Sequence, residues 1–232
     1  MVDPLIKEKL KEKYPTEKVL AVPFGMVEKI PDKFHILKAH GRASRPSVRK
    51  WDVLGTFVAR YEAEYNDALI QLIPYTIIFS TRRNKFLVAK RIAGDDRLIS
   101  KHSIGFGGHV NPEDMGDKAL SAIEKAQRRE LLEEVAIRRY KGAPVLFGTV
   151  RDLSSKTPDH LGFCYLQKCE TAKIVETDTL SGIWMSISEL ADHYHSFESW
   201  SRYIIDHIFQ VHYMATGSYE DSISQDWIDL IC

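Results

Sequence analysis

The residues best suited to chemistry are three glutamates in one short run, Glu130, Glu133 and Glu134. Their spacing of i, i+3 and i+4 places the three carboxylates on one face if the segment is helical. Like charges at that spacing destabilise an isolated helix by roughly 0.2–0.5 kcal/mol per pair. The cluster therefore calls for either solvent or a bound cation beside it.

The face that carries these glutamates continues an apolar stripe. At about 100° per residue, Ala119, Ile123 and Ala126 fall on the same arc, and Ile137 extends it at the other end. Carboxylates that point inward need a hard cation, and all-oxygen ligation suits Mg²⁺ or Mn²⁺. The pattern favours a metal site, and an ordinary solvated charged face is the alternative.

The run from Arg129 to Ile137 resembles the second half of the Nudix box, G-x5-E-x7-R-E-U-x-E-E-x-G-U, where U is a bulky aliphatic residue. It matches every fixed position except one, because Ala136 stands where glycine is usual. Gly107 and Gly108 resemble the glycine pair that opens the box. Five residues beyond Gly108, Asp114 stands where glutamate is expected, and fourteen residues instead of seven then precede the run. The seven extra residues fit either a longer helix or a longer loop.

The resemblance implies a hydrolase that cleaves a diphosphate linkage in a nucleoside diphosphate derivative by attack of water on phosphorus. Mg²⁺ or Mn²⁺ would neutralise developing charge and lower the pKa of the water. Glu134 and the Gly108 carbonyl are the implied principal metal ligands, and Glu130 and Glu133 would complete the site. Glu130 is also the implied candidate for general base. Arg129 would orient Glu133 or brace the glycine loop, with a plain surface cation as the alternative.

Residues near the glycine turn are candidates for binding the substrate. Gly107 and Gly108 let the backbone approach a ligand closely. Arg91 and Lys101 lie near this turn in sequence and could contact phosphates, although basic residues also simply decorate strand ends. His109 could reach a phosphate or a metal, with a structural histidine as the alternative.

Members of the resembling family often add a carboxylate from a loop before a tryptophan-containing strand. Asp178 and Glu176, ahead of Trp184, are the candidates here, and an exposed solvated loop is the alternative for either residue. Substrate choice in this fold is made by loops outside the box, so the sequence leaves every class of nucleoside diphosphate derivative open.

The composition excludes several classes of protein. Lys plus Arg and Asp plus Glu both number 32, so no global field attracts nucleic acid. No apolar run reaches the length of about 18 residues that a membrane span needs, and no export signal stands at the start. Cys164, Cys169 and Cys232 are odd in number and read as reduced thiols. We expect a cytoplasmic protein without a membrane segment or a DNA-binding module.

The apolar pattern also predicts the elements that position these residues. Asp3 should cap a helix over residues 3–13, and residues 33–50, rich in Lys, Arg and His, should form a loop. Ser188 should cap a helix from Glu189 onward, and residues 196–211 should form one amphipathic helix. A further short helix could end the chain after residue 217. Strands are expected over residues 19–24, 69–79, 86–91, 103–110, 145–150, 160–167 and 182–186.

The order of these elements fits an α/β fold, and the resemblance implies a Nudix-like α/β/α sandwich with a mixed β-sheet. We expect residues 1–68 to form an N-terminal extension that packs on the core. Residues 69–212 should form the Nudix hydrolase domain, and residues 213–232 a C-terminal tail. Family habit suggests a homodimer.

Two other functions remain open at this stage. Ala136 and the expanded spacing would also suit a catalytically weak nucleotide-binding or regulatory Nudix module. Chemistry like that of the Nudix-fold isopentenyl diphosphate isomerases would need a catalytic cysteine. Cys164 lies in an apolar strand, where a buried, inert thiol is the better interpretation. The complete glutamate set favours the hydrolase.

Overall fold

The structure is a computed structural model that describes residues 4–37, 55–92, 101–117, 119–154 and 160–217. The predicted cap at Asp3, most of the predicted basic loop, the possible terminal helix and Cys232 lie outside these residues. Two compact units interleave along the chain. The first comprises Met1–Thr76, Phe106–Glu134 and Leu146–Tyr165, and the second comprises Ile77–Gly105, Val135–Val145 and Leu166–Cys232.

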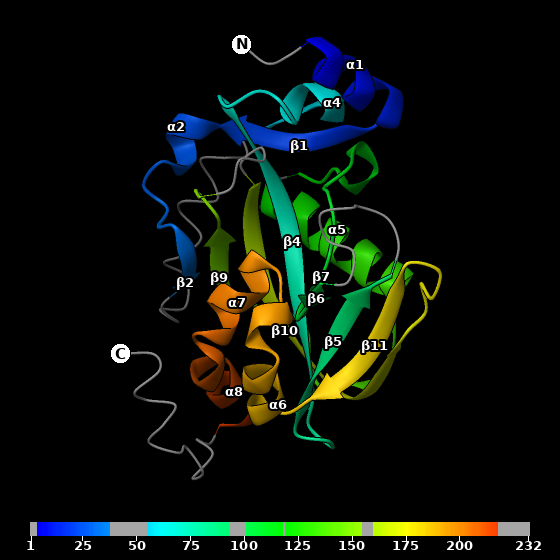
Figure 1. The fold of residues 1–232 in the computed structure, drawn as a ribbon, viewed down its shortest axis with the longest axis vertical. Helices are drawn as coiled ribbons and strands as arrows, with labels where there is room; N and C mark the ends of the chain where they lie inside the picture. The colour runs from blue at the N-terminus through cyan, green and yellow to red at the C-terminus, as the bar shows by residue number, and fades with distance from the viewer. Residues whose placement is uncertain (1–3, 38–54, 93–100, 118, 155–159, 218–232) are drawn as a thin grey trace. The chain divides into compact units, whose positions relative to one another are not determined.

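Strand β1 (Lys18–Pro23) organises one end of the first unit. It pairs antiparallel with β3 (Thr56–Ala59) and with the start of β4 (Leu69–Ser80). Figure 1 shows β1 crossing the end of β4, with the short helices α1 (Pro4–Lys13) and α4 (Arg60–Ala63) beside it. The predicted helix over residues 3–13 is confirmed from Pro4 onward. The strand predicted over residues 19–24 is confirmed as far as Pro23, because Phe24 begins the short helix α2 (Phe24–Val27).

The basic loop predicted from residue 33 begins instead as a strand. Strand β2 (Lys33–Ile36) pairs antiparallel with β9 (Val145–Arg151). Phe34 is buried, and its ring meets the ring of Phe147 edge-on with centroids 5.7 Å apart. The loop prediction is wrong for these four residues, because alternate apolar side chains reach the core between basic ones.

Helix α5 (Ala119–Glu134) confirms the predicted inward stripe. Ala119, Ile123 and Ala126 are buried in one apolar cluster with Leu72 and Phe163. Complete burial of an isoleucine side chain contributes roughly 1.5–3 kcal/mol. This packing fixes the rotation of α5 and therefore the direction in which its last turns project their side chains.

The helix ends at Glu134, so the prediction that it reaches Ile137 is wrong. Val135 opens strand β8 (Val135–Tyr140), which pairs antiparallel with β10 (His160–Ile174) and lies opposite Ile174. The β-branched side chains of Val135 and Ile137 favour the extended backbone. Ala136, at the usual glycine position of the box, is already part of this strand.

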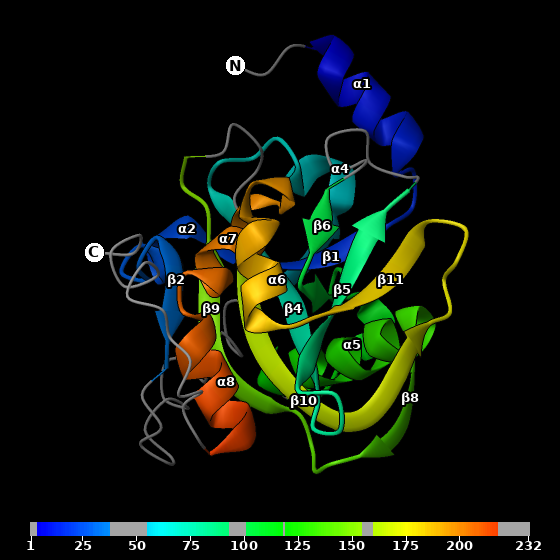
Figure 2. The same cartoon turned by 60° about the horizontal axis from the view of Figure 1, so that its bottom comes forward.

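In the second unit, strand β5 (Lys85–Arg91) pairs antiparallel with β11 (Leu180–Met185) and with β6 (His102–Ser103). Figure 2 shows β5 and β11 side by side. The strand predicted over residues 86–91 is confirmed, and the strand predicted over residues 182–186 is confirmed as far as Met185, because Ser186 caps the helix that follows. The strand predicted over residues 103–110 is shorter than expected, because only β6 and β7 (Gly105–Phe106) are extended before the glycine turn.

Within the described residues, β11 is followed by the α-helices α6 (Ile187–Asp192), α7 (Ser199–Ile205) and α8 (Ile208–Thr216). Ser186, and not Ser188, caps α6. Its hydroxyl accepts from the Glu189 N–H at 3.3 Å, and Oε2 of Glu189 accepts from the Ser186 N–H at 2.7 Å. This reciprocal capping box places the start of the helix two residues earlier than predicted.

The single helix predicted over residues 196–211 is divided between α7 and α8. Asp206 ends α7 and His207 precedes α8. Ile204, Ile208 and Val211 are all buried, as the apolar pattern predicts. That pattern continues across the break and therefore could not reveal it. No helix among the described residues is long and apolar enough to cross a membrane.

Candidate functional site

Arg129 joins the glycine turn to α5 within the first unit. Its Nε and Nη2 donate to Oδ1 and Oδ2 of Asp114 at 3.0 and 2.7 Å, a bidentate pair. Nη2 also donates to the His109 carbonyl at 2.9 Å. Nη1 donates to Glu130 at 2.7 Å and to Glu133 at 3.3 Å. The Asp114 bonds, followed by those to Glu130, hold the pKa of Arg129 above its ordinary value.

Asp114 is buried at the end of the short η1 helix (Pro112–Asp114). Its Oδ2 accepts from the Asn111 N–H at 2.9 Å as well as from Arg129. Asp114 stands at the glutamate position of the box, and these bonds use its carboxylate to brace the turn. Ten of the fourteen residues between Asp114 and Arg129 belong to α5, so most of the expanded segment is helix and not loop.

The glycine pair permits two close approaches of the backbone. A Cβ atom on Gly107 would lie 1.9 Å from the carbonyl oxygen of Pro74. A Cβ atom on Gly108 would lie 2.6 Å from Oε2 of Glu130. The absence of a side chain at Gly108 therefore lets the Glu130 carboxylate reach the turn.

The three glutamates gather at the C-terminal end of α5, where the helix itself carries partial negative charge. The Glu130 side chain is 15% exposed, and burial raises its pKa against the opposing effect of Arg129. Glu134 is partly buried. The Glu133 side chain is 56% exposed. The inward orientation predicted for all three glutamates is therefore wrong for Glu133.

This arrangement favours a divalent cation. The formal charge of the cluster is −3, because four carboxylates face one guanidinium: Asp114, Glu130, Glu133 and Glu134, with Arg129 as the cation. The donors are all carboxylate or carbonyl oxygens, which suit Mg²⁺ and Mn²⁺. The donor types therefore match those that the predicted ion prefers.

The other predicted site residues belong to the second unit. The Arg91 N–H donates to the Lys101 carbonyl at 3.1 Å, so these two residues adjoin one another at the end of β5. Glu176 and Asp178 are exposed in the connection between β10 and β11, as the solvated-loop alternative predicts. Their roles toward a substrate stay predictions.

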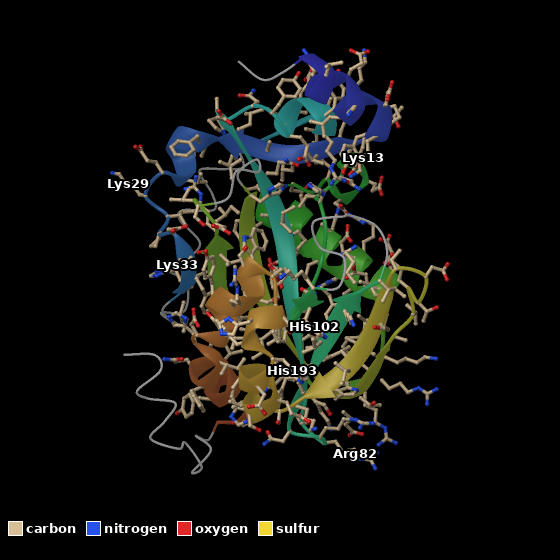
Figure 3. All side chains as sticks on the ribbon, in the orientation of Figure 1. Lys13, Lys29, Lys33, Arg82, His102 and His193 are labelled. Atoms are coloured by element: carbon tan, nitrogen blue, oxygen red, sulfur yellow. The ribbon has the colours of Figure 1, made fainter. Side chains whose placement is uncertain are left out.

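His102 in β6 is part of a histidine pair in the second unit (Figure 3). Its ring lies 6.2 Å from that of His193, and its Nδ1 lies 2.8 Å from the hydroxyl of Ser196. Burial, together with the charge of Lys90, lowers the pKa of His102. The ring is therefore well suited to anchoring the chain where η2 (Tyr194–Ser196) ends.

Sequence reasoning missed a second group of potential metal ligands in the first unit. Glu64, His109 and His160 each bring one ligand atom to within 4.8 Å of the others. The two imidazole rings meet edge-on with centroids 5.6 Å apart. Burial, with the nearby charge of Arg60, lowers the pKa of His109 well below its usual value. The three residues come from distant parts of the chain, so no local spacing could have revealed them.

Comparison with known proteins gives one curated relative and a group of solved structures. Protein YmaB of Bacillus subtilis (strain 168) is 31% identical over 156 residues, which cover 63% of this chain and 75% of that protein. The crystal structure of Tm1382, described as a candidate Nudix hydrolase, has a TM-score of 0.70 at 24% identity. The structural match covers 84% of this chain and 100% of Tm1382. No family model matches. The predicted Nudix-like α/β/α sandwich with a mixed sheet is confirmed as the fold.

Proposed function

Because this chain belongs to the same family as Protein YmaB and has the Nudix fold, we propose that it is a metal-dependent Nudix pyrophosphohydrolase. It would cleave a diphosphate linkage in a nucleoside diphosphate derivative by attack of water on phosphorus. The observation that carries this proposal is the Glu130 carboxylate beside Gly108, with Arg129 joining Glu130, Glu133 and the His109 carbonyl, and with Glu134 one residue after Glu133 at the end of α5.

Oxygen donors on two elements would hold the metal. Glu134 and the Gly108 carbonyl would be the principal ligands, with Glu130 and Glu133 completing the set. Bound Mg²⁺ or Mn²⁺ would supply charge neutralisation at the phosphate oxygens and a lowered pKa for the attacking water. Gly107 would let the backbone approach the diphosphate. The Pro74 carbonyl, which fills the space of a Gly107 side chain, gives a separate structural reason for glycine at this position.

Side chains around this metal would accept the proton of the attacking water and hold the glycine turn in place. Burial raises the pKa of Glu130, which makes its carboxylate a better proton acceptor than an exposed glutamate. Arg129 would keep Glu130 oriented through the 2.7 Å bond and hold the His109 carbonyl in place. That Arg91 and Lys101 contact substrate phosphates as cationic donors stays a prediction.

The alternatives have weaker support. A catalytically weak nucleotide-binding or regulatory module was suggested by Ala136 and by the expanded spacing. Ala136 lies in β8, and the expansion is mostly α5, so neither moves Glu130 away from Gly108. An isomerase would need an accessible cysteine, and Cys164 is fully buried. Homodimer formation, a cytoplasmic location and the division into extension, domain and tail stay predictions.

A substrate panel tests the proposed function. The purified chain is incubated with sugar nucleotides, dinucleoside polyphosphates and nucleoside triphosphates, with Mg²⁺, with Mn²⁺ or with a chelator, and phosphate-containing products are separated. We expect one class to be cleaved between two phosphates only when metal is present. Saturable nucleotide binding by the folded, metal-loaded chain without any turnover would establish the binding module instead.

A further inference from the structure

Beyond the carboxylate cluster of α5, we propose that Glu64, His109 and His160 form a second metal site, which takes a divalent transition-metal ion of the Zn²⁺ class. The ligand atoms of the three side chains already lie within 4.8 Å of one another. Two imidazoles and one carboxylate are a donor set suited to zinc, iron, copper or nickel, whereas Mg²⁺ prefers oxygen donors alone. The site therefore selects a different ion from the one expected at α5.

The ring of His109 provides an independent sign of a ligand. Its Nε2 is buried and has no hydrogen-bond partner among the residues that the structure describes. Nearly all buried polar side-chain atoms in proteins are hydrogen-bonded, and a bound ion is one accepted explanation for an exception. A metal beside His160 and Glu64 would satisfy this nitrogen.

The carboxylate of Glu64 is held in place to serve as the third ligand. Its side chain is only 10% exposed, and Oε1 accepts from Nε of Arg60 at 3.3 Å. A carboxylate has about four lone-pair positions, so this single bond leaves capacity for an ion. Arg60 would otherwise repel a cation, but Glu17 pairs with it through both carboxylate oxygens at 3.0 Å. The formal charge of Glu17, Glu64 and Arg60 together is therefore −1.

Three separate parts of the chain supply the ligands. Glu64 is the C-cap of α4, His109 follows the glycine pair and His160 begins β10. Zinc bonds of about 2.0–2.2 Å place tetrahedral ligand atoms roughly 3.3–3.5 Å apart, so small side-chain rotations would close the shell. Three protein ligands would leave a fourth position for water or another small ligand. The ion would also fix the backbone of His109, whose carbonyl accepts from Arg129.

Metal titration in excess Mg²⁺ tests this site, because Mg²⁺ occupies oxygen sites and leaves an imidazole site open. The full chain is stripped with a chelator and titrated with Zn²⁺ by calorimetry and with Co²⁺ by visible absorption. We expect one tightly bound equivalent and intense Co²⁺ bands. His160→Ala and Glu64→Gln should each weaken binding by about 100-fold or more, since even losing a hydrogen-bond partner of a ligand costs roughly 10–100-fold.

Two controls assign the signal to this site. Glu134→Gln, in the α5 cluster, and His195→Ala, an exposed histidine elsewhere, should both keep the bound equivalent and the Co²⁺ bands. X-ray absorption of the Zn²⁺-loaded wild-type chain should show scattering from two imidazoles, a measurement that needs no variant to fold. The proposal is overturned by no uptake in excess Mg²⁺, by uptake that survives His160→Ala, or by a zinc shell made of oxygen alone.

Discussion

At the scale of single residues, Arg129 determines the shape of the candidate site. One guanidinium holds the buried Asp114, the backbone of His109 and the Glu130 carboxylate together. This geometry depends on the flat, five-donor fork of arginine and not on its charge alone. A lysine at this position would keep the charge and lose the simultaneous contacts.

We therefore expect Arg129→Lys to lower both stability and turnover. Breaking a buried charge pair typically costs 3–5 kcal/mol, and the partial exposure of Arg129 reduces the expected loss to about 2 kcal/mol. Chemical denaturation measures this loss, and Asp114→Asn in a double-mutant cycle measures the coupling between the two side chains. Additive effects of the two changes would contradict the pairing.

The two glycines should respond differently to the same substitution. Gly107→Ala places a Cβ atom 1.9 Å from the Pro74 carbonyl, which is backbone and cannot move away cheaply, so we expect a loss of several kcal/mol in stability. Gly108→Ala meets only the end of the flexible Glu130 side chain at 2.6 Å. It should weaken Mn²⁺ binding more than it lowers the melting temperature.

Melting curves and Mn²⁺ titrations on both variants check this contrast. Equal destabilisation by the two substitutions, with Mn²⁺ affinity unchanged in Gly108→Ala, would show that Glu130 does not depend on the open space at Gly108.

Sequence spacing predicted the residues of the α5 cluster because they lie within one helical turn or next to a glycine pair. It did not predict that Asp114 would be the main partner of Arg129, since that contact depends on how α5 packs against η1. Glu64 and His160 carried no sequence signal at all. Only the folding of distant strands and helices brings them to His109.

At the scale of elements, the apolar pattern predicted most strands and the rotation of α5, because burial of a stripe dominates both. Its errors are at boundaries. The strand β2 was hidden among basic residues, and the break between α7 and α8 was hidden because apolar spacing continues through it. The start of α6 depended on choosing between Ser186 and Ser188, which only the hydrogen bonds distinguish.

The capping box of α6 gives a pH-dependent prediction. The Ser186 N–H, followed by Lys85, lowers the pKa of Glu189 from 4.5 to about 2. A carboxylate with a depressed folded-state pKa stabilises the protein above pH 4.5, and this contribution is lost as the pH falls toward 2. Because the Glu189 side chain is 45% exposed, we expect less than about 1 kcal/mol.

Denaturation of wild type and Glu189→Gln between about pH 3 and pH 6 measures this contribution. The stability difference between the two proteins should be largest near pH 6 and shrink at lower pH. A difference that grows as the pH falls would contradict the assignment.

At the scale of the whole molecule, the chain balances 32 basic against 32 acidic residues and carries nine histidines. A net charge near zero promotes self-association, because electrostatic repulsion between copies is absent. The sequence isoelectric point is about 7.1, so the chain gains net positive charge as the pH falls below that value. Light scattering should therefore report stronger attraction between molecules near pH 7 than near about pH 6.

Added salt provides the control for this prediction. Screening should restore attraction at the lower pH and change little near neutrality. Scattering that is independent of pH at low salt would show that short-range contacts, and not net charge, govern association.

The central claim is that the glutamates of α5 hold the metal on which hydrolysis depends. The most direct test compares wild type, Glu134→Gln and Glu124→Gln, an exposed glutamate on the same helix, with Mg²⁺ as the variable and the best panel substrate. We predict that Glu134→Gln loses metal affinity and turnover together, by about 100-fold or more, and that Glu124→Gln matches wild type. Full turnover by Glu134→Gln at the same Mg²⁺ concentration would contradict the account.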